Sequence, residues 1–501
     1  MSSRIVDTPA SAHTGLVVLD GIRLGVTDVV RLADGTARPV PGTEGMKRVT
    51  EAWDAARQIA ATGRVYGRST GVGANRNEPV PTEAAAEHGL RLLRSHAGAI
   101  GEELPARQVR AMLAVRANQL LAGGAGLRPT VVTALCEALE SGAYPVVHEF
   151  GSVGTGDIAA LAQAGLALAG EHPWKGVGPE PQPLDNNDAL AFISSNALAL
   201  GQSALALDEL RGLLEATQVV GALSLLAVDG SHEAYAAPVH AARPHRGSAE
   251  VARRIRGLIG ADERPTPPLG RIQDPYGFRC LPQIHGPAHD AADALEAVLA
   301  VELNAAAENP LISPEDMAAY HHGGFYQAQL ALALDHFRLA LTQVARLSTS
   351  RLSTLNEPAY TRLRPFLADH EPASSGVMIL EYAAGAALGD LRAFSAPASL
   401  GHAVLSRGVE EQASFASLAA RQTLRACGAY RLVVGCELVA AVRALRQRDH
   451  GPDPDLPVGR ALELAYAVLD ADQADRPLTH DVTTAAALLD RFTDLWRGSE
   501  A

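Results

Sequence analysis

The stretch Gly151-Ser152-Val153-Gly154-Thr155-Gly156-Asp157, followed by the apolar run 158–170, sets the first constraint on the fold. Its glycines allow backbone conformations and close approaches that a Cβ atom would forbid. Asp157 stands where a helix is expected to begin, and the run after it is apolar on every face, which predicts a buried helix. Such a loop places N–H groups and the positive end of a helix dipole inside the protein, where they suit an anion or an electrophile. A tight turn with an N-cap is the plainer interpretation.

The composition is that of a helical globular protein. Among 501 residues, 47% are hydrophobic and only 4% aromatic, so helix formers dominate over β-branched and aromatic residues. The net charge of -13 argues against nucleic acid or an anionic membrane as the main partner. The four cysteines form no C-x-x-C pair, which favours a reducing compartment. We find no signal peptide in residues 1–21 and no uncharged apolar stretch of about 20 residues, so we expect a cytoplasmic protein without a membrane span.

Apolar residues at helical spacing predict helices along most of the chain. These helices are predicted over 47–61, 84–93, 108–121, 131–139, 189–215, 218–228, 288–305, 326–355, 375–396 and 410–446. Several exceed ordinary helix lengths, which is typical of a bundle of long antiparallel helices. Short β-like pieces such as 16–19 occur near the N-terminus, and 240–275 is the least regular middle stretch.

We therefore predict a mainly α fold in two parts. An N-terminal domain, 1–200, has mixed α/β-like character and carries the Tyr66 loop and the Gly-rich loop. The remainder, 201–501, forms the central bundle of long antiparallel helices with shorter C-terminal helices.

Chemically useful side chains gather in the loops. Tyr66 lies between glycines, and a tyrosine becomes a useful base only if its pKa is lowered, for instance beside a cation. Arg279 lies in a Pro-bounded stretch, 273–283, and could hold a carboxylate by paired hydrogen bonds. Adjacent carboxylates, Glu410 and Glu411, stand at the start of a predicted helix. Taken singly, such residues are more often structural than functional.

Together these motifs resemble the histidine and aromatic amino-acid ammonia-lyase family along nearly the whole chain. The family's Tyr-Gly-Val-Asn-Thr-Gly-Phe-Gly is similar to residues 66–73, its Ser-His-x-x-Gly to 95–98, and its Arg-Ala-Asn to 116–118. Its Gln-Asp-x-Tyr-Ser-Leu-Arg-Cys-x-Pro-Gln is similar to 273–283. Further matches fall at 302–304, 308–310, 375–378 and 396–399.

The resemblance implies a mainly helical homotetramer in which each active site draws on three subunits. It implies elimination of ammonia from an L-amino acid to give a trans-α,β-unsaturated acid. Members of this family use no metal or bound organic cofactor, and make the electrophile methylideneimidazolone (MIO) from their own Ala-Ser-Gly.

The resemblance also assigns roles to individual residues. Tyr66 would remove the β-proton and Arg279 would bind the substrate carboxylate, while Tyr276 and Gln283 would surround the electrophile. Substrate contacts are implied for His96, Ser194, Asn309, Phe325 and Glu410.

The sequence departs from the family pattern in the Gly-rich loop itself. The family has Gly-Ser-Val-Gly-Ala-Ser-Gly-Asp, whereas residues 151–157 are one residue shorter and have no serine between Gly154 and Asp157. In one hypothesis, the Gly156 nitrogen attacks the Gly154 carbonyl and Thr155 loses water, which gives a more hindered electrophile with an extra methyl group. In the other, no electrophile forms and the loop is an anion-receptive turn at a helix start.

Other substitutions fall around the same site. The family's Asn-Gly-Thr falls at 194–196, so that its helper asparagine corresponds to Ser194. Its Gly-Asn-Phe-His falls at 323–326, and its Gln-Glu-Asp-His falls at 409–412, where Glu410 is kept and the histidine is lost. Two classes of function stay open: an ammonia-lyase-like enzyme for a histidine-type or aromatic amino acid, and a MIO-less homologue with altered chemistry or a non-catalytic, amino-acid-binding tetramer. An aminomutase shares these motifs and also stays open.

Overall fold

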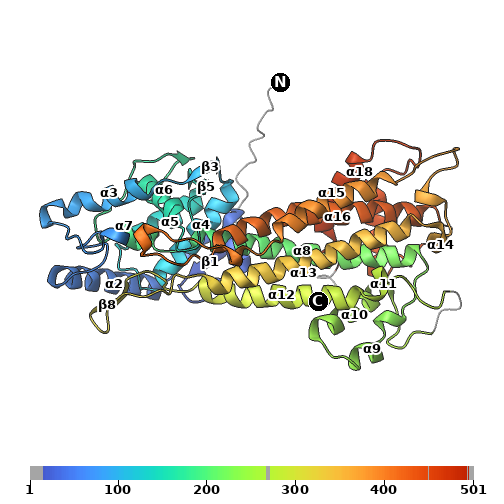
Figure 1. The fold of residues 1–501 in the computed structure, drawn as a ribbon, viewed down its shortest axis with the longest axis horizontal. Helices are drawn as coiled ribbons and strands as arrows, with labels where there is room; N and C mark the ends of the chain where they lie inside the picture. Colours follow the sequence, from blue (N-terminus) through green and yellow to red (C-terminus); the bar gives the residue numbers. More distant parts are fainter. Residues whose placement is uncertain (1–14, 267–270, 449–450, 494, 496–501) are drawn as a thin grey trace, which may run out of the picture. The chain divides into compact units, whose positions relative to one another are not determined.

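The computed structural model describes residues 15–266, 271–448, 451–493 and 495 (Figure 1). Residues 1–14, part of the stretch in which no signal peptide is expected, lie outside the described residues. The chain divides into two compact units. Unit 1 combines Met1–Asp208 with Glu296–Leu334 and Pro397–Arg421. Unit 2 consists of Glu209–Leu295, Asp335–Ala396 and Gln422–Ala501. The sequence-based division assigns every residue after 200 to the bundle, whereas Glu296–Leu334 and Pro397–Arg421 belong to unit 1. Helical spacing in the sequence does not show that the chain returns to the first unit.

Unit 1 combines helices with two-stranded sheets. The only parallel pair among the described strands is β1 with β2, with Leu16 opposite Arg38. The helix α4 is buried along most of its length and packs against α1 and α5. The elements are β1 (Leu16–Leu19), α1 (Val26–Ala33), β2 (Arg38–Pro41), α2 (Thr43–Thr62), η1 (Gly73–Asn75), η2 (Thr82–Ala84), α3 (Ala85–His96), β3 (Ile100–Glu103), α4 (Ala106–Leu121), α5 (Thr130–Ser141), β4 (Tyr144–Pro145), β5 (His148–Phe150), α6 (Ile158–Leu168), β6 (Trp174–Lys175), α7 (Ala189–Ile193), β7 (Leu311–Ser313), β8 (Ala318–Tyr320), η5 (Ala398–Leu400) and η6 (Ser406–Gly408).

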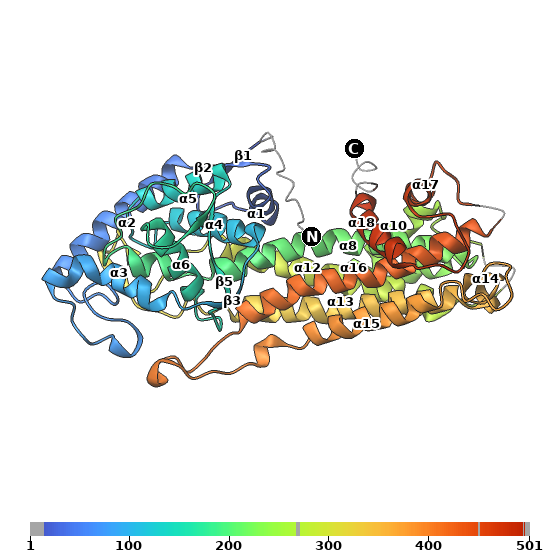
Figure 2. The same cartoon turned by 90° about the horizontal axis from the view of Figure 1, so that it is seen from above.

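Unit 2 is built on long helices that lie side by side in both views (Figures 1 and 2). Four of them, α8 (Ala197–Ala227), α12 (Leu281–Glu302), α13 (Ala328–Leu355) and α16 (Ala416–Arg446), also contribute residues to unit 1. The remaining elements of unit 2 are η3 (Glu233–Tyr235), α9 (Ala237–Ala241), α10 (Arg246–Ile259), α11 (Tyr276–Arg279), α14 (Pro358–Thr361), η4 (Pro365–Leu367), α15 (Ile379–Phe394), α17 (Pro457–Val468) and α18 (Thr479–Phe492). The predicted mainly α fold with a long-helix bundle is confirmed.

Several local predictions need correction. The helix predicted over 189–215 is interrupted between α7 and α8, and the helix predicted over 410–446 begins only at Ala416, so Glu410 and Glu411 precede it. The stretch 240–275, expected to be irregular, contains the helix α10, whose buried Val251, Ile255 and Leu258 recur at helical spacing among many charged residues. Gly260 ends α10 with a φ of +65°, the left-handed conformation that glycine adopts without strain. The predicted break at 216–217 does not occur, because α8 runs unbroken over that position.

The core of unit 2 holds a buried ion pair. The guanidinium of Arg351 donates to both carboxylate oxygens of Glu437, at 2.5 and 2.8 Å. Ser224 and Ser348 also donate to Glu437, at 2.7 and 2.5 Å. Because every carboxylate oxygen is hydrogen-bonded, the bundle tolerates a charge that would otherwise be costly to bury.

The stretch Ala189–Ala227 includes one helix that is long and apolar enough to cross a membrane by composition alone. Its most apolar window is 94% buried inside the protein, which is also the behaviour of a core helix. Burial by the protein therefore accounts for its apolar composition.

Candidate active site

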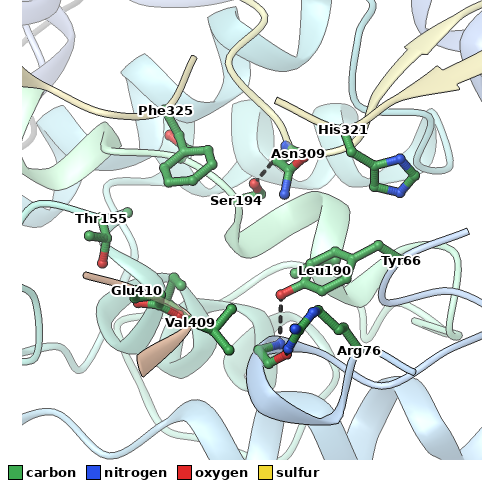
Figure 3. Close-up of a pocket in the computed structure, with 14 residues that line it drawn as sticks. Tyr66, Arg76, Thr155, Leu190, Ser194, Asn309, His321, Phe325, Val409 and Glu410 are labelled. Carbon is green, nitrogen blue, oxygen red and sulfur yellow. Dashed lines mark hydrogen bonds between the residues drawn. The ribbon is translucent and has the colours of Figure 1, made fainter. Parts of the chain in front are cut away.

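A cavity of about 440 Å³ lies in unit 1 (Figure 3). It is lined by stretches far apart in the sequence, around residues 66–76, 155–195, 309–325 and 409–410. Apolar walls come from Ile158, Leu190 and Val409. Of the predicted site residues, the lining includes Tyr66, Thr155, Gly156, Ser194, Asn309, Phe325 and Glu410.

Tyr66 points its hydroxyl group toward the centre of this cavity (Figure 3). The phenol oxygen accepts a hydrogen bond of 2.7 Å from the backbone N–H of Gly73. The ring meets the edge of His321, with centroids 6.4 Å apart and planes at 86°. Burial raises the pKa of Tyr66, and the carboxylate of Glu410 adds to that rise, whereas the Gly73 N–H and Arg76 oppose it. The phenol is therefore held in its protonated form more firmly than in water.

The Gly-rich loop presents Thr155 to the same cavity. Gly154 and Gly156 have φ values of +90° and +111°, a region that L side chains rarely adopt. A Cβ atom at residue 154 would also overlap the Ser414 hydroxyl. The loop is closed internally by Ser152, whose hydroxyl donates to the Gly156 carbonyl at 2.9 Å.

Two residues that sequence reasoning left out of the site hold this loop. Asn196 accepts the N–H of Gly156 at 3.2 Å and donates to the carbonyl of Phe325 at 2.7 Å. Ser414 donates to the carbonyl of Gly154 at 2.8 Å. The amide that reaches the loop thus comes from Asn196, two residues beyond the position of the family's helper asparagine. Asn196 could have been predicted from the sequence, because it is an amide two residues from position 194. Ser414 could not, because it lies 260 residues from Gly154 and belongs to no recognised motif.

Asp157 precedes α6 as predicted, but its side chain does not cap that helix. Its carboxylate instead accepts the backbone N–H of Ala199 at 2.7 Å, in the first turn of α8. Its own N–H donates to the carbonyl of Ser195 at 2.7 Å. The side chain is completely buried, and burial raises its pKa to about 6. Asp157 therefore ties the Gly-rich loop to the beginning of α8.

The far wall of the cavity rests on hydrogen bonds from Ser194 and Asn309. The Ser194 hydroxyl accepts the N–H of Asn309 at 3.0 Å, and the Asn309 amide oxygen accepts the N–H of His322 at 3.0 Å. The buried guanidinium of Arg116 binds the neighbouring Glu308 at 2.8 Å. Arg116, the first residue of the Arg-Ala-Asn motif, therefore supports this wall of the cavity by binding Glu308, the residue before Asn309.

Glu410 is held by the backbone of its own segment. It forms an isolated antiparallel bridge with Leu405, in which Leu405 N–H donates to the Glu410 carbonyl at 2.8 Å. Three of the four residues between them, Ser406 to Gly408, have positive φ values. This tight loop also contacts the Tyr66 loop, because the Ser406 hydroxyl accepts the N–H of Ala74 at 3.0 Å.

The other predicted residues do not line the described cavity. His96 ends α3, where its Nδ1 lies 2.9 Å from the carbonyl oxygen of Leu92. Tyr276, Arg279 and Gln283 belong to unit 2, with the Arg279 guanidinium 4.7 Å from the centre of the Tyr276 ring. Gly154 does not line the cavity, although the next two residues, Thr155 and Gly156, do.

Comparison with known proteins agrees with this description. Residues 24–471 match the family model of the aromatic amino acid lyases. Histidine ammonia-lyase from Geobacillus thermodenitrificans is 32% identical over 492 residues, with 95% of this chain and 97% of the relative covered.

Solved structures extend the likeness. Ergothionase, an ergothioneine-degrading enzyme from Treponema denticola, superposes with a TM-score of 0.89 at 26% identity, covering 96% of this chain and 99% of that one. Tyrosine aminomutase from Streptomyces globisporus gives a TM-score of 0.88 at 25% identity, covering 96% and 98%. With a family match over most of its length, this chain belongs to the aromatic amino acid lyase family.

Proposed function

We propose that this chain is an amino-acid ammonia-lyase that acts on a histidine-type or aromatic L-amino acid in the unit 1 cavity and releases an α,β-unsaturated acid. The observation that carries the proposal is the meeting of Tyr66, Thr155 and Glu410 at one cavity from three separate stretches. Family membership supports the same class of reaction, that of a carbon–nitrogen lyase.

The elimination breaks one C–H and one C–N bond. Tyr66 accepts the β-proton, the electrons of the C–H bond form the new double bond, and the amine leaves with the electrons of the C–N bond. The β-proton is weakly acidic, so the reaction needs both a positioned base and electrostatic stabilisation of the charge that develops. Glu410 faces the same cavity and suits the substrate's amine or a polar ring.

Residues 154–156 fit the self-formed group that the family pattern implies. When formed, that group would supply an electrophile that makes the substrate's amine a better leaving group. Asn196 accepts the N–H of Gly156, whose nitrogen has to attack, and Ser414 polarises the carbonyl of Gly154, which has to be attacked. Thr155 carries the hydroxyl that would leave as the second water, and its methyl group would stay on the group that forms.

The proposed enzyme works as a homotetramer in the cytoplasm, with a small amino acid as its substrate and neither nucleic acid nor membrane as a partner. Further copies would supply Tyr276, Arg279 and Gln283, which do not line the cavity of their own unit 1. Tyr276 is 69% exposed and Gln283 is also exposed, which suits contact with another copy. Arg279 would hold the substrate carboxylate by paired hydrogen bonds. Ser194, Asn309 and Phe325, which line the cavity, would contact the substrate as predicted, whereas His96 does not line it and is given no role in this proposal.

Intact-mass spectrometry of the purified chain tests the electrophile. Cyclisation and dehydration remove two waters from residues 154–156, so an unchanged mass contradicts it. Thr155→Ala is the matched control, because alanine has no hydroxyl to lose. Turnover with an unchanged mass would replace this proposal by a MIO-less homologue with altered chemistry.

A substrate screen tests the reaction. Histidine, phenylalanine, tyrosine and ergothioneine are each incubated with the enzyme, and the conjugated product is followed by ultraviolet absorbance. Chromatography for β-amino acids detects an aminomutase. Tyr66→Phe is expected to abolish turnover and to leave assembly intact, and unchanged turnover refutes Tyr66 as the base. No product from any substrate favours a non-catalytic binding tetramer.

A further inference from the structure

Arg76 lines the cavity but has no part in the elimination described above. It follows η1 directly, at the end of the short turn that begins at Gly73. Its Nη1 donates to the carbonyl of Gly73 at 3.5 Å, the long end of the hydrogen-bonding range. Figure 3 shows the guanidinium group on the side of the cavity where the Tyr66 hydroxyl lies.

The two backbone polar groups of Gly73 bind Tyr66 and Arg76, one each. The N–H of Gly73 donates to the phenol oxygen at 2.7 Å, and its carbonyl holds the guanidinium of Arg76. Gly73 has a φ of +56°, and a Cβ atom there would stand 2.5 Å from the Ser406 hydroxyl, so the turn requires glycine. One residue thereby anchors a neutral donor and a cation close to a single oxygen atom.

The position of the turn is fixed from outside. Ser406 accepts the N–H of Ala74 at 3.0 Å, and Ser406 lies in the same tight loop that sets Glu410 through its bridge to Leu405. The cation and the carboxylate that act on Tyr66 therefore sit on two loops that are hydrogen-bonded to each other.

The charged and titratable groups around Tyr66 oppose one another. Burial disfavours the phenolate most strongly and Glu410 adds to that effect, whereas the Gly73 N–H and, to a smaller extent, Arg76 favour it. The His321 ring packs against the phenol ring in a T-shaped arrangement. Of the residues described around this oxygen, Arg76 is the one full positive charge that supports its ionised form.

We propose that Arg76 is a positioning residue for catalysis, whose charge stabilises the phenolate of Tyr66 from which the β-proton is accepted. The inference rests on the proposed lyase function for its consequence in turnover, but the coupling between the two side chains exists without substrate. With a neutral residue at 76, only the Gly73 N–H would oppose burial and Glu410, and less phenolate would be present at a given pH.

Ultraviolet difference titration tests the coupling on the full chain. Phenolate absorbance is recorded against pH with and without Tyr66, using Tyr66→Phe in each background so that the difference isolates this tyrosine. In Arg76→Gln the Tyr66 component should move to higher pH, and Arg76→Lys should restore it toward the parent. The matched control is Arg64→Gln, which removes another exposed charge near the same loop. Arg64 binds the Asn77 carbonyl at 2.8 Å and does not line the cavity.

Turnover gives the second readout. In Arg76→Gln the acid limb of the kcat/KM profile should shift to higher pH, with kcat falling several-fold near neutral pH while KM changes little. A Tyr66 component that titrates identically in Arg76→Gln and the parent overturns the proposal. So does a rise in KM alone, which would make Arg76 a substrate ligand. A parent enzyme without turnover contradicts the proposed function, whereas the titration still decides the coupling.

Discussion

Replacing Asp157 by asparagine should stabilise the protein at neutral pH. The carboxylate is completely buried, and one of its oxygens, Oδ2, accepts the N–H of Ala199. Asparagine keeps an oxygen for that bond and removes the charge. Its amide nitrogen would replace Oδ1, which has no hydrogen-bond partner among the described residues, so the buried N–H groups find no acceptor there and offset part of the gain.

The magnitude follows from the pKa. Burial raises the pKa of Asp157 from 3.8 to about 6. At about 1.4 kcal/mol per pKa unit, the ionised carboxylate costs the folded state about 3 kcal/mol. Below pH 3.8 both states are protonated and the cost is absent. Between pH 3.8 and about 6 the folded state keeps a proton that the unfolded state releases, so stability falls as the pH rises. Above that window the whole cost is present.

Thermal unfolding at a fixed protomer concentration measures the difference between Asp157→Asn and the parent. The variant should melt higher at pH 7, by on the order of 5 °C if unit 1 unfolds cooperatively, and this advantage should shrink as the pH falls through about 6 and be lost below pH 3.8. Asp54→Asn, which changes an exposed carboxylate on α2, is the control and should show no such dependence. A variant that melts lower at pH 7, or a difference that does not change with pH, would refute the reasoning.

Three further predictions concern the loop and the bundle. Arg351→Met should cost roughly 3–5 kcal/mol in denaturant unfolding because it leaves Glu437 buried and unpaired, whereas the added change Glu437→Leu should recover most of that loss; equal single and double losses would contradict this. Gly154→Ala should cost at least about 1–2 kcal/mol from its positive φ, with more from the overlap with Ser414, and unchanged melting would mean that the loop rearranges easily. Ser414→Ala should lower the fraction of chains that lack two waters in intact-mass spectra, and an undiminished fraction would remove Ser414 from the maturation step.

The sequence was sufficient wherever the determining contacts are local. Apolar spacing located the long helices, and the glycines at 154 and 156 marked the bend before α6, where both positive φ values occur. The family resemblance then brought Tyr66 and Glu410 to one site, although they are far apart in the sequence.

The rest of the site depends on contacts that periodicity does not encode. Asp157 has the residue type and position of an N-cap, yet its partner is Ala199 on another helix. Arg76 follows the recognised Tyr66 motif by only a few residues, and its place in the cavity depends on how the turn at Gly73 is held by Ser406. Side-chain roles of this kind are set by tertiary packing rather than by local spacing.

The shortened loop and its glycine at position 154 are best understood as one change. With one residue fewer, the chain must complete the bend before α6 over a shorter path, and Gly154 does so at a φ of +90° against Ser414. An alanine, the family's residue before its serine, would meet both the strained conformation and the Ser414 hydroxyl there. The absence of the family's alanine at this position is therefore not evidence that the electrophile cannot form. The substitution that bears on chemistry is Thr155, whose additional methyl group would stand in the cavity beside the reacting amine, and which still carries the hydroxyl that dehydration requires.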